Sequence, residues 1–454
     1  MQTKPFIILR DMESADAVSI RWKKSRISMS EIIKNGHNEI KNKYYLGRIK
    51  RDLTNFFKWM ALAILTGVVV GGASSVFAIC IRWVTTFRAD NKWMFLLLPV
   101  AGLIIVFMYQ RLDKNDGGTN QVLSTIRSKD DVPLKSAPLI FLSTVLTHLT
   151  GGSAGREGAA IQFGGSIGNQ LGRIFHLDEF DHHVMGGMSA AFAAVFGTPM
   201  AAAVFAMEVV SVGVMYYAAL LPCVIASIIA AKFAAGIGIH PEVFHVTVIP
   251  ELTAVTGAKM AVIAAGCGAV SILFCIALKL ASTLYTKYLK NPYVRVVVAA
   301  LIVMGITFIL QTDDYMGAGN QLIAKAIETG RARPLDFVWK IILTAITMRA
   351  GFRGGEIVPA FCVGASFGCV MGQLLGFPPV VAAAAGMVAL FCGVTNCPIT
   401  SMLISFELFG FAGVSYYLIA ISISYALSGY YSLYKDQTIV YSKYKAKYIN
   451  RKTR

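Results

Sequence analysis

The chain has 454 residues, of which 56% are hydrophobic and only 15% charged, and its formal net charge is +17. Charged residues make up about 25% of ordinary soluble domains, so this composition excludes a large soluble protein with a fully solvated surface. It indicates an integral membrane protein.

Basic residues concentrate at the two ends of the chain. One dense run (Lys41, Lys43, Arg48, Lys50 and Arg51) precedes the first long apolar stretch, and another closes the sequence. Lys and Arg beside membrane spans usually face the cytoplasm. We therefore expect residues 1–58 to be a basic cytoplasmic segment rather than a cleaved signal, and both termini to be cytoplasmic. We expect the positive charge to face anionic lipid and not nucleic acid.

From Trp59 onward, apolar stretches recur that are long enough for spans of about 20 residues. They are 59–84, 93–109, 137–150, 184–239, 260–279, 294–310 and 357–430. Glycines inside these stretches are typical of close helix packing in lipid. The sequence therefore predicts an all-α polytopic membrane protein. The eight cysteines lie mostly in apolar stretches without CxxC pairs, so we expect buried thiols rather than disulfides or metal ligands.

The chain contains an internal repeat with a period of about 200 residues. The matching segments are Gly117–Gln121 with Gly317–Gln321, Gly155-Arg-Glu157 with Gly354-Gly-Glu356, and Pro199–Glu208 with Pro398–Glu407. Because they occur in the same order, we interpret them as a duplicated unit. We predict repeats at 59–256 and 257–430, followed by a short C-terminal segment at 431–454. We favour inverted topology, with broken helices meeting near the midplane, over two parallel repeats.

Four glutamates stand in apolar context between Ser136 and Gly429: Glu157, Glu208, Glu356 and Glu407. A carboxylate at membrane depth costs about 2.5 kcal/mol or more, so such residues usually pair, protonate or line a wet path. For Glu208 and Glu407 we favour a structural role. We predict that Glu157 and Glu356 act in gating and proton transfer.

Glu157 has the most informative context. Four glycines in Gly151–Gly158 predict an irregular backbone from which a helix then starts. The first N–H groups of a helix are unpaired and lie at the positive end of its dipole, so they can hold an anion. The Glu157 carboxylate can occupy that place itself and leave it when protonated. The loop at Arg353–Pro359 predicts a second such element from the other repeat.

At these residues the chain resembles the CLC family of anion channels and anion/proton antiporters, over about 59–445. Gly155-Arg-Glu-Gly158 is similar to the family's strongest motif. The resemblance implies that Glu157 is the external gate, and that Tyr441 in Gln437–Ser442 supplies an inner pore hydroxyl. It also implies a homodimer in which each subunit has its own pathway.

The departures from the family pattern resemble its fluoride-specific bacterial branch, which exports fluoride in exchange for protons. Gly118-Thr-Asn replaces the usual serine turn, Glu356 and Ile357 replace apolar and Phe residues, and Val209 stands where chloride antiporters carry an internal glutamate. The resemblance implies these anion-binding residues: Gly118, Thr119, Asn120, Arg156, Gly158, Ile357, Val358 and Tyr441. It implies an inner-membrane fluoride/proton antiporter without cofactor or metal.

Four other functions are compatible with a membrane protein of this composition. The same fold could carry a chloride or nitrate antiporter, or a passive anion channel. An intramembrane enzyme would need a nucleophile or metal site, and one cluster imitates metal ligands: His176, Asp178, Asp181, His182 and His183. We interpret that cluster as a solvated turn and expect no enzymatic activity. A purely scaffolding protein would leave the intramembrane acids without a purpose.

Overall fold

The computed structural model describes residues 29–114, 116–128, 132–175, 180–240, 243–246 and 248–453, without the side chains of 29–45, 180 and 181. The chain divides into two units, residues 1–58 and 59–454. Helix α1 (Met29–Asp90) begins in the first unit and ends in the second. Its continuation past Trp59 is apolar, as expected for a membrane span. His176 and Asp178 of the predicted turn lie outside the described residues.

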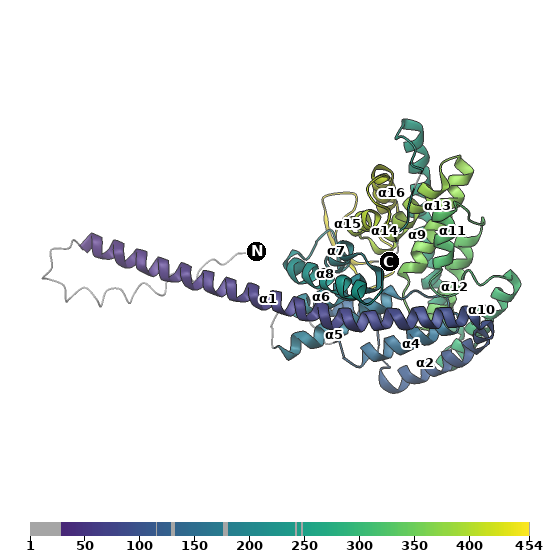
Figure 1. Cartoon of the computed structure of the whole chain (residues 1–454), viewed down its shortest axis with the longest axis horizontal. Helices are drawn as coiled ribbons and strands as arrows, with labels where there is room; N and C mark the ends of the chain where they lie inside the picture. Colours follow the sequence, from purple (N-terminus) through teal and green to yellow (C-terminus); the bar gives the residue numbers. More distant parts are fainter. Residues whose placement is uncertain are drawn as a thin grey trace. The chain divides into compact units, whose positions relative to one another are not determined.

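The membrane unit repeats the same order of helices (Figure 1). Its first half contains η2 (Lys92–Leu97), α2 (Leu98–Leu112), α3 (Thr119–Ser128), α4 (Ser136–Leu149), α5 (Glu157–Ile174), α6 (Phe180–Phe196), α7 (Pro199–Glu208), β1 (Ser211–Val212), η3 (Tyr217–Ala219) and α8 (Leu220–Gly236). Its second half contains α9 (Ala254–Tyr288), α10 (Pro292–Leu310), α11 (Asn320–Glu328), α12 (Asp336–Ala350), α13 (Ile357–Leu375), α14 (Pro379–Thr395), α15 (Pro398–Phe409), α16 (Val414–Leu427), β2 (Thr438–Tyr441) and β3 (Tyr448–Lys452).

Among the described residues, six helical segments are long and apolar enough to cross a membrane. They are Leu46–Asp90, Lys92–Leu112, Tyr217–Gly236, Ala254–Tyr288, Pro292–Leu310 and Ile357–Leu375. Helices α4, α7, α14, α15 and α16 are apolar but shorter. Helices that start or end inside a membrane need protein around their ends, because lipid offers no hydrogen bonds. The predicted helical membrane fold with broken helices is confirmed.

A small sheet at the end of the chain is the part of the fold that the prediction of an all-helical protein omitted. Strand β1 pairs in parallel with β2, and β2 pairs antiparallel with β3. These strands are two to five residues long. Strands this short leave too little alternation to be recognised in the sequence.

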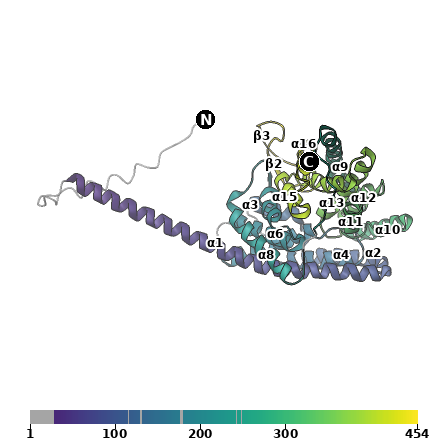
Figure 2. The same ribbon diagram turned by 45° about the horizontal axis from the view of Figure 1, so that its top comes forward.

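The two repeats pack in the same way. Helix α5 packs on α6 as α13 packs on α14, and α2 lies beside α10 (Figure 2). A Cβ on Gly164 would lie 2.4 Å from the carbonyl oxygen of Gly187, and one on Gly364 would lie 2.4 Å from that of Gly386. Glycine is therefore required at both crossings, because no side-chain carbon fits there.

Glu208 and Glu407 hold the two repeats together through their carboxylates. At the end of α7, Glu208 accepts from the N–H groups of Ile399 (3.0 Å) and Thr400 (2.8 Å) at the start of α15, and from the Thr400 hydroxyl. At α15, Glu407 accepts from the N–H groups of Met200 and Ala201 (2.9 Å each) at the start of α7. Each acid thus caps the equivalent helix of the other repeat, where the helix dipole favours a negative charge. This geometry gives both acids a structural role.

We expect Glu208→Ala to lower the free energy of unfolding by about 2–4 kcal/mol, because it leaves buried N–H groups of α15 unpaired. Thermal unfolding in detergent measures the change. Glu328→Ala is the control, since Glu328 is exposed at the end of α11. Equal unfolding temperatures for the two variants would show that the cap contributes nothing.

Candidate functional site

The two glycine loops meet through their backbones. Gly155 and Gly355 exchange both N–H···O=C hydrogen bonds, each 2.7 Å long, in an isolated antiparallel bridge. Helix α5 begins two residues after Gly155, and α13 begins two residues after Gly355. The starts of two helices from opposite repeats are therefore fixed against each other, which brings their unpaired N–H groups into one region.

The bridge pairs the two repeats in a register that differs from the match between Gly155-Arg-Glu157 and Gly354-Gly-Glu356 in the sequence. Arg156 stands immediately before α5 and Glu356 immediately before α13, so these two residues are structural equivalents. Glu157 is equivalent to Ile357. Matching Glu157 with Glu356 was therefore wrong by one residue, because it aligned two identical side chains rather than the helix starts.

Each of these carboxylates is paired with an arginine of its own repeat. Glu157, which is 1% exposed, lies 3.2 Å from Nε of Arg156 and accepts from the Arg156 backbone N–H at 3.1 Å. Glu356, which is partly exposed, accepts from Nη2 of Arg349 in α12 at 2.7 Å. Removing one partner of such a pair leaves an uncompensated charge, so each arginine and its carboxylate stabilise each other.

The predicted anion-binding turn lies against the start of α5. Gly118 has a φ of 65°, in the left-handed region that glycine adopts readily. The hydroxyl of Thr119 donates to the carbonyl oxygen of Gly158 at 3.2 Å, so its donor is already used. The side-chain oxygen of Asn120 is buried and has no hydrogen-bond partner among the described residues. Gly158 itself faces the other loop, because a Cβ there would lie 2.8 Å from Cα of Gly355.

Arg353 links that turn to the second repeat, and the sequence analysis missed this role. Its Nη1 lies 3.0 Å from the buried carboxylate of Asp116, whose other oxygen accepts from Nε2 of Gln162 at 2.7 Å. The guanidinium also stacks over the ring of Tyr109, 3.9 Å from its centroid. An Asp two residues before the predicted binding turn, with an Arg in the opposite loop, was the available signal.

Two cavities meet near Glu157. An open basin of about 710 Å³ reaches Asn320. Several of the side chains that line it are cationic: Arg82, Arg88, Lys92 and Arg156. A second cavity of about 10 Å³ is lined by Glu157, Asn320, Val358 and Phe361, with room for about one water-sized particle. Asn320 lines both cavities, whereas Glu157 lines the small cavity and its neighbour Arg156 lines the basin.

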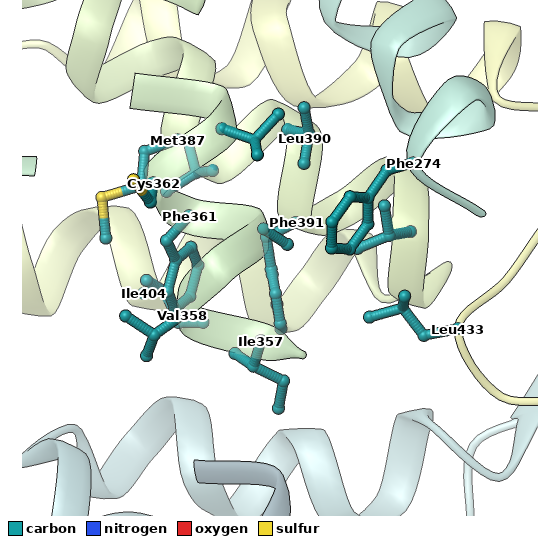
Figure 3. Packing of buried hydrophobic residues seen from close by; sticks show 14 of the residues in the cluster. Phe274, Ile357, Val358, Phe361, Cys362, Met387, Leu390, Phe391, Ile404 and Leu433 are labelled. Atoms are coloured by element: carbon teal, nitrogen blue, oxygen red, sulfur yellow. The ribbon is translucent and has the colours of Figure 1, made fainter. Parts of the chain in front are cut away.

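Apolar side chains close the other side of the small cavity. Figure 3 shows Ile357 and Val358 beside Phe361 and Phe391. The ring centroids of Phe361 and Phe391 are 4.9 Å apart. Ile357 and Val358 are buried, so these two predicted anion-binding residues offer their backbone N–H groups rather than polar side chains.

The structure does not place Tyr441 with these residues. Tyr441 is 46% exposed on β2, with its ring against Tyr448, so an inner pore position is a poor match for it. Tyr434 is 2% exposed, its hydroxyl has no hydrogen-bond partner among the described residues, and Glu356 acts on it electrostatically. Tyr434 stands seven residues before Tyr441 in the same segment and carries the same chemical group, but it was not among the predicted site residues.

The predicted turn at 176–183 contains no metal site among its described residues. Helix α6 begins at Phe180, so the second half of this segment is helical rather than a turn. The ring of Trp59 stacks on His183, with centroids 4.8 Å apart, and meets the His182 ring edge-on at 5.0 Å. Both histidines therefore pack against α1.

Comparison with known proteins defines the class. Residues 101–429 match the voltage-gated chloride channel family. The "Chloride/fluoride channel protein" of Pseudomonas syringae pv. tomato is 35% identical over 401 residues, covering 85% of this chain and 88% of that protein. The H(+)/Cl(-) exchange transporter ClcA of Vibrio cholerae is 25% identical over 394 residues, covering 79% and 83%.

A solved structure described as a CLC-type fluoride/proton antiporter is similar to this fold with a TM-score of 0.82 and 31% identity. The similarity covers 84% of this chain and 98% of the chain in that structure. A cyanobacterial Cl-/H+ antiporter has the same fold with a TM-score of 0.70 and 18% identity, covering 82% and 94%. The chain belongs to the voltage-gated chloride channel, or CLC, family of membrane proteins.

We expect Gly355→Ala to reduce ion transport at least about tenfold, because a Cβ there would lie 2.4 Å from the backbone nitrogen of Gly158 and would separate the paired loops. Ion efflux from liposomes measures the effect. Gly305→Ala in α10 is the control, since a Cβ there meets nothing within 4 Å. Transport by Gly355→Ala at the rate of Gly305→Ala would contradict the importance of the bridge.

Proposed function

We propose that this protein exports fluoride across the cell membrane in exchange for protons that move inward. The observation that carries the proposal is the buried Glu157 carboxylate, which lines a cavity of one-water size at the meeting point of two helix starts, while its partner Arg156 lines the open basin. The relatives named for fluoride, at 35% and 31% identity, support the choice of ion.

Glu157 acts as the gate in this proposal. Its carboxylate, held by Arg156, occupies the place beside α5 and α13 that a transported anion would take. A proton entering from the basin neutralises the carboxylate, which then loses its attraction to Arg156 and to the helix starts. Neutral Glu157 can turn away and admit an anion to the vacated place. One residue thus carries the proton and opens the path.

Glu356 couples the two ions on the other side of the bridge. It stands before α13, and its partner Arg349 lies on α12. Because Glu356 also acts electrostatically on Tyr434, a proton on Glu356 changes the field at that buried hydroxyl. Gly118, Thr119, Asn120 and the first N–H groups of α13 supply the remaining donors in this proposal. Thr119 donates to the ion only after releasing Gly158.

Fluoride suits a site of this kind for two physical reasons. It is about the size of a water molecule, so it matches the cavity of about 10 Å³ beside Glu157. It also holds its hydration shell tightly, so the protein must replace water with strong donors such as helix N–H groups and arginine. Fluoride accepts a proton at mild acidity, which makes a path lined by carboxylates suitable for coupled movement.

The surrounding organisation is part of the proposal. We place the basic segment 1–58 and both termini in the cytoplasm of a cell with this protein in its inner membrane. The end of α1 that carries Arg82 and Arg88 then lies on the outer side, with the basin open to it. We further propose a homodimer with one pathway in each subunit, and keep the repeats at 59–256 and 257–430 with a tail at 431–454.

A second candidate is exchange of chloride for protons, which the similarity to the Vibrio cholerae exchanger supports. Passive anion conduction on the same fold is the remaining alternative. Fluoride/proton exchange, chloride/proton exchange and passive conduction would all use the same basin and gate. They differ in ion preference and in whether protons move uphill.

Liposomes containing the purified protein should lose fluoride much faster than chloride, and an outward fluoride gradient should drive proton uptake. The measurement records both anions with electrodes while external pH is followed. Chloride efflux equal to fluoride efflux would favour the second candidate. Fluoride efflux without any pH change would indicate a channel.

We expect Glu157→Gln to abolish fluoride-driven proton movement while the protein stays folded, because glutamine cannot carry the proton. Glu356→Gln should keep fluoride movement but change the number of protons moved per fluoride. Both variants are measured in the same liposome assay, with Glu328→Gln as a matched surface control. Unchanged proton coupling in Glu157→Gln would contradict the gate assignment.

A further inference from the structure

Helix α12 carries a buried polar stripe through the membrane unit. The stripe consists of residues at positions i, i+4, i+8 and i+11 of one helix face: Asp336, Lys340, Thr344 and Thr347. All four side chains are buried. Side chains at this spacing point to the same side of a helix, so the stripe faces one neighbour along its length.

One end of the stripe holds the turn that precedes α11. Asp336 accepts from the hydroxyl of Tyr315 at 2.6 Å, and Nζ of Lys340 donates to the carbonyl oxygens of Tyr315 (2.9 Å) and Gly317 (2.7 Å). Lys340 also lies directly behind Gly319, where a Cβ would be 3.2 Å from its Nζ. Gly319 precedes the start of α11 at Asn320.

The other end holds the loop that carries Glu157. The third donor of Lys340 goes to the hydroxyl of Ser153 at 3.0 Å. Thr344 contacts the same hydroxyl at 3.0 Å, and Thr347 accepts from the Ser153 backbone N–H at 3.3 Å. The N–H of Gly317 donates directly to the Gly152 carbonyl oxygen at 3.1 Å, so turn and loop also touch.

Lys340 breaks the symmetry between the repeats. Helix α4 starts at Ser136 as α12 starts at Asp336, and Thr144 and Thr147 correspond to Thr344 and Thr347. At the place of Lys340, α4 has Ile140, which is buried in an apolar cluster. Lys340 is 0% exposed, and all three of its donors go to neutral oxygens. Burying an ammonium group is costly, so a protein without need of its charge gains by placing an apolar residue there.

We propose that Lys340 is a positioning residue for the transport reaction. It fixes the turn of Tyr315–Gly319 to the Ser153 loop, and so sets the distance between Asn320 and Glu157, which together line the small cavity. It also places an ammonium group, bonded only to neutral oxygens, behind the start of α11, which raises the local affinity for an anion. This inference rests on the proposed function, because the anion and the gate are those proposed above.

The experiment compares Lys340→Met, which removes charge and donors, with Lys340→Gln, which removes the charge but keeps an amide donor. Ile140→Met is the control at the equivalent position of the first repeat. Hydrogen exchange of residues 150–156 and 313–319 reports the positioning, and it is measured without transported ion. The fluoride KM and the proton-to-fluoride ratio report its effect on transport in liposomes.

We expect Lys340→Met to exchange at least about tenfold faster in both segments and to raise the fluoride KM at least about tenfold. Lys340→Gln should raise the KM with a smaller change in exchange. A loss of stability alone would lower the amount of active protein without changing KM or the ion ratio. Unchanged exchange in both segments of Lys340→Met would overturn the proposal.

If Lys340→Met does not fold, Thr344→Val tests the same proposal. It removes the contact with Ser153 and keeps the lysine, so exchange should rise in 150–156 and not in 313–319. Equal exchange to wild type in 150–156 would overturn the proposal as well. If the wild-type protein carries no fluoride, the proposed function fails, while the exchange data still decide whether Lys340 joins the turn to the loop.

Discussion

The antiparallel bridge between Gly155 and Gly355 is the constraint on which the rest of the site depends. Backbone groups away from water must find partners inside the protein, and two loops that interrupt helices can do so by pairing with each other. The pairing leaves no room for side chains, which explains the glycines on both sides. It also directs the starts of α5 and α13 to one place, where an anion or a carboxylate is stabilised by N–H groups. Glu157, Arg156 and Glu356 owe their positions to this contact.

The intramembrane acids show several ways of placing a negative charge in an apolar unit. Glu208 and Glu407 accept from helix N–H groups, which gives them permanent partners. Asp116 pairs with Arg353 and accepts from Gln162. The carboxylates of Glu157 and Glu356 form ion pairs with Arg156 and Arg349. The acids at the helix starts of α7 and α15 thus join the two repeats, whereas Glu157 and Glu356 each pair with an arginine of their own repeat.

Much of this arrangement could be predicted from the sequence, and the errors have physical causes. Apolar length and the internal repeat predicted the helical membrane unit, and the glycines around Glu157 predicted the helix start there. The register between the repeats was missed by one residue, because backbone pairing and not residue identity sets it. Tyr441 was preferred to Tyr434 because burial is invisible in a short polar segment. The roles of Lys340 and Arg353 were not assigned, because their partners Ser153 and Asp116 lie far away in the chain.

The reciprocal caps of Glu208 and Glu407 bear on how this protein is made. The N–H groups that donate to the Glu208 carboxylate belong to Ile399 and Thr400, which a ribosome adds about 190 residues later. Until then the first repeat sits in the bilayer with an unsatisfied acid and an unpaired Gly155 loop. Its completion therefore waits for insertion of the second repeat, and the two halves reach their final packing together. A chain interrupted between them would present the quality-control machinery of the cell with a half whose polar groups lack partners.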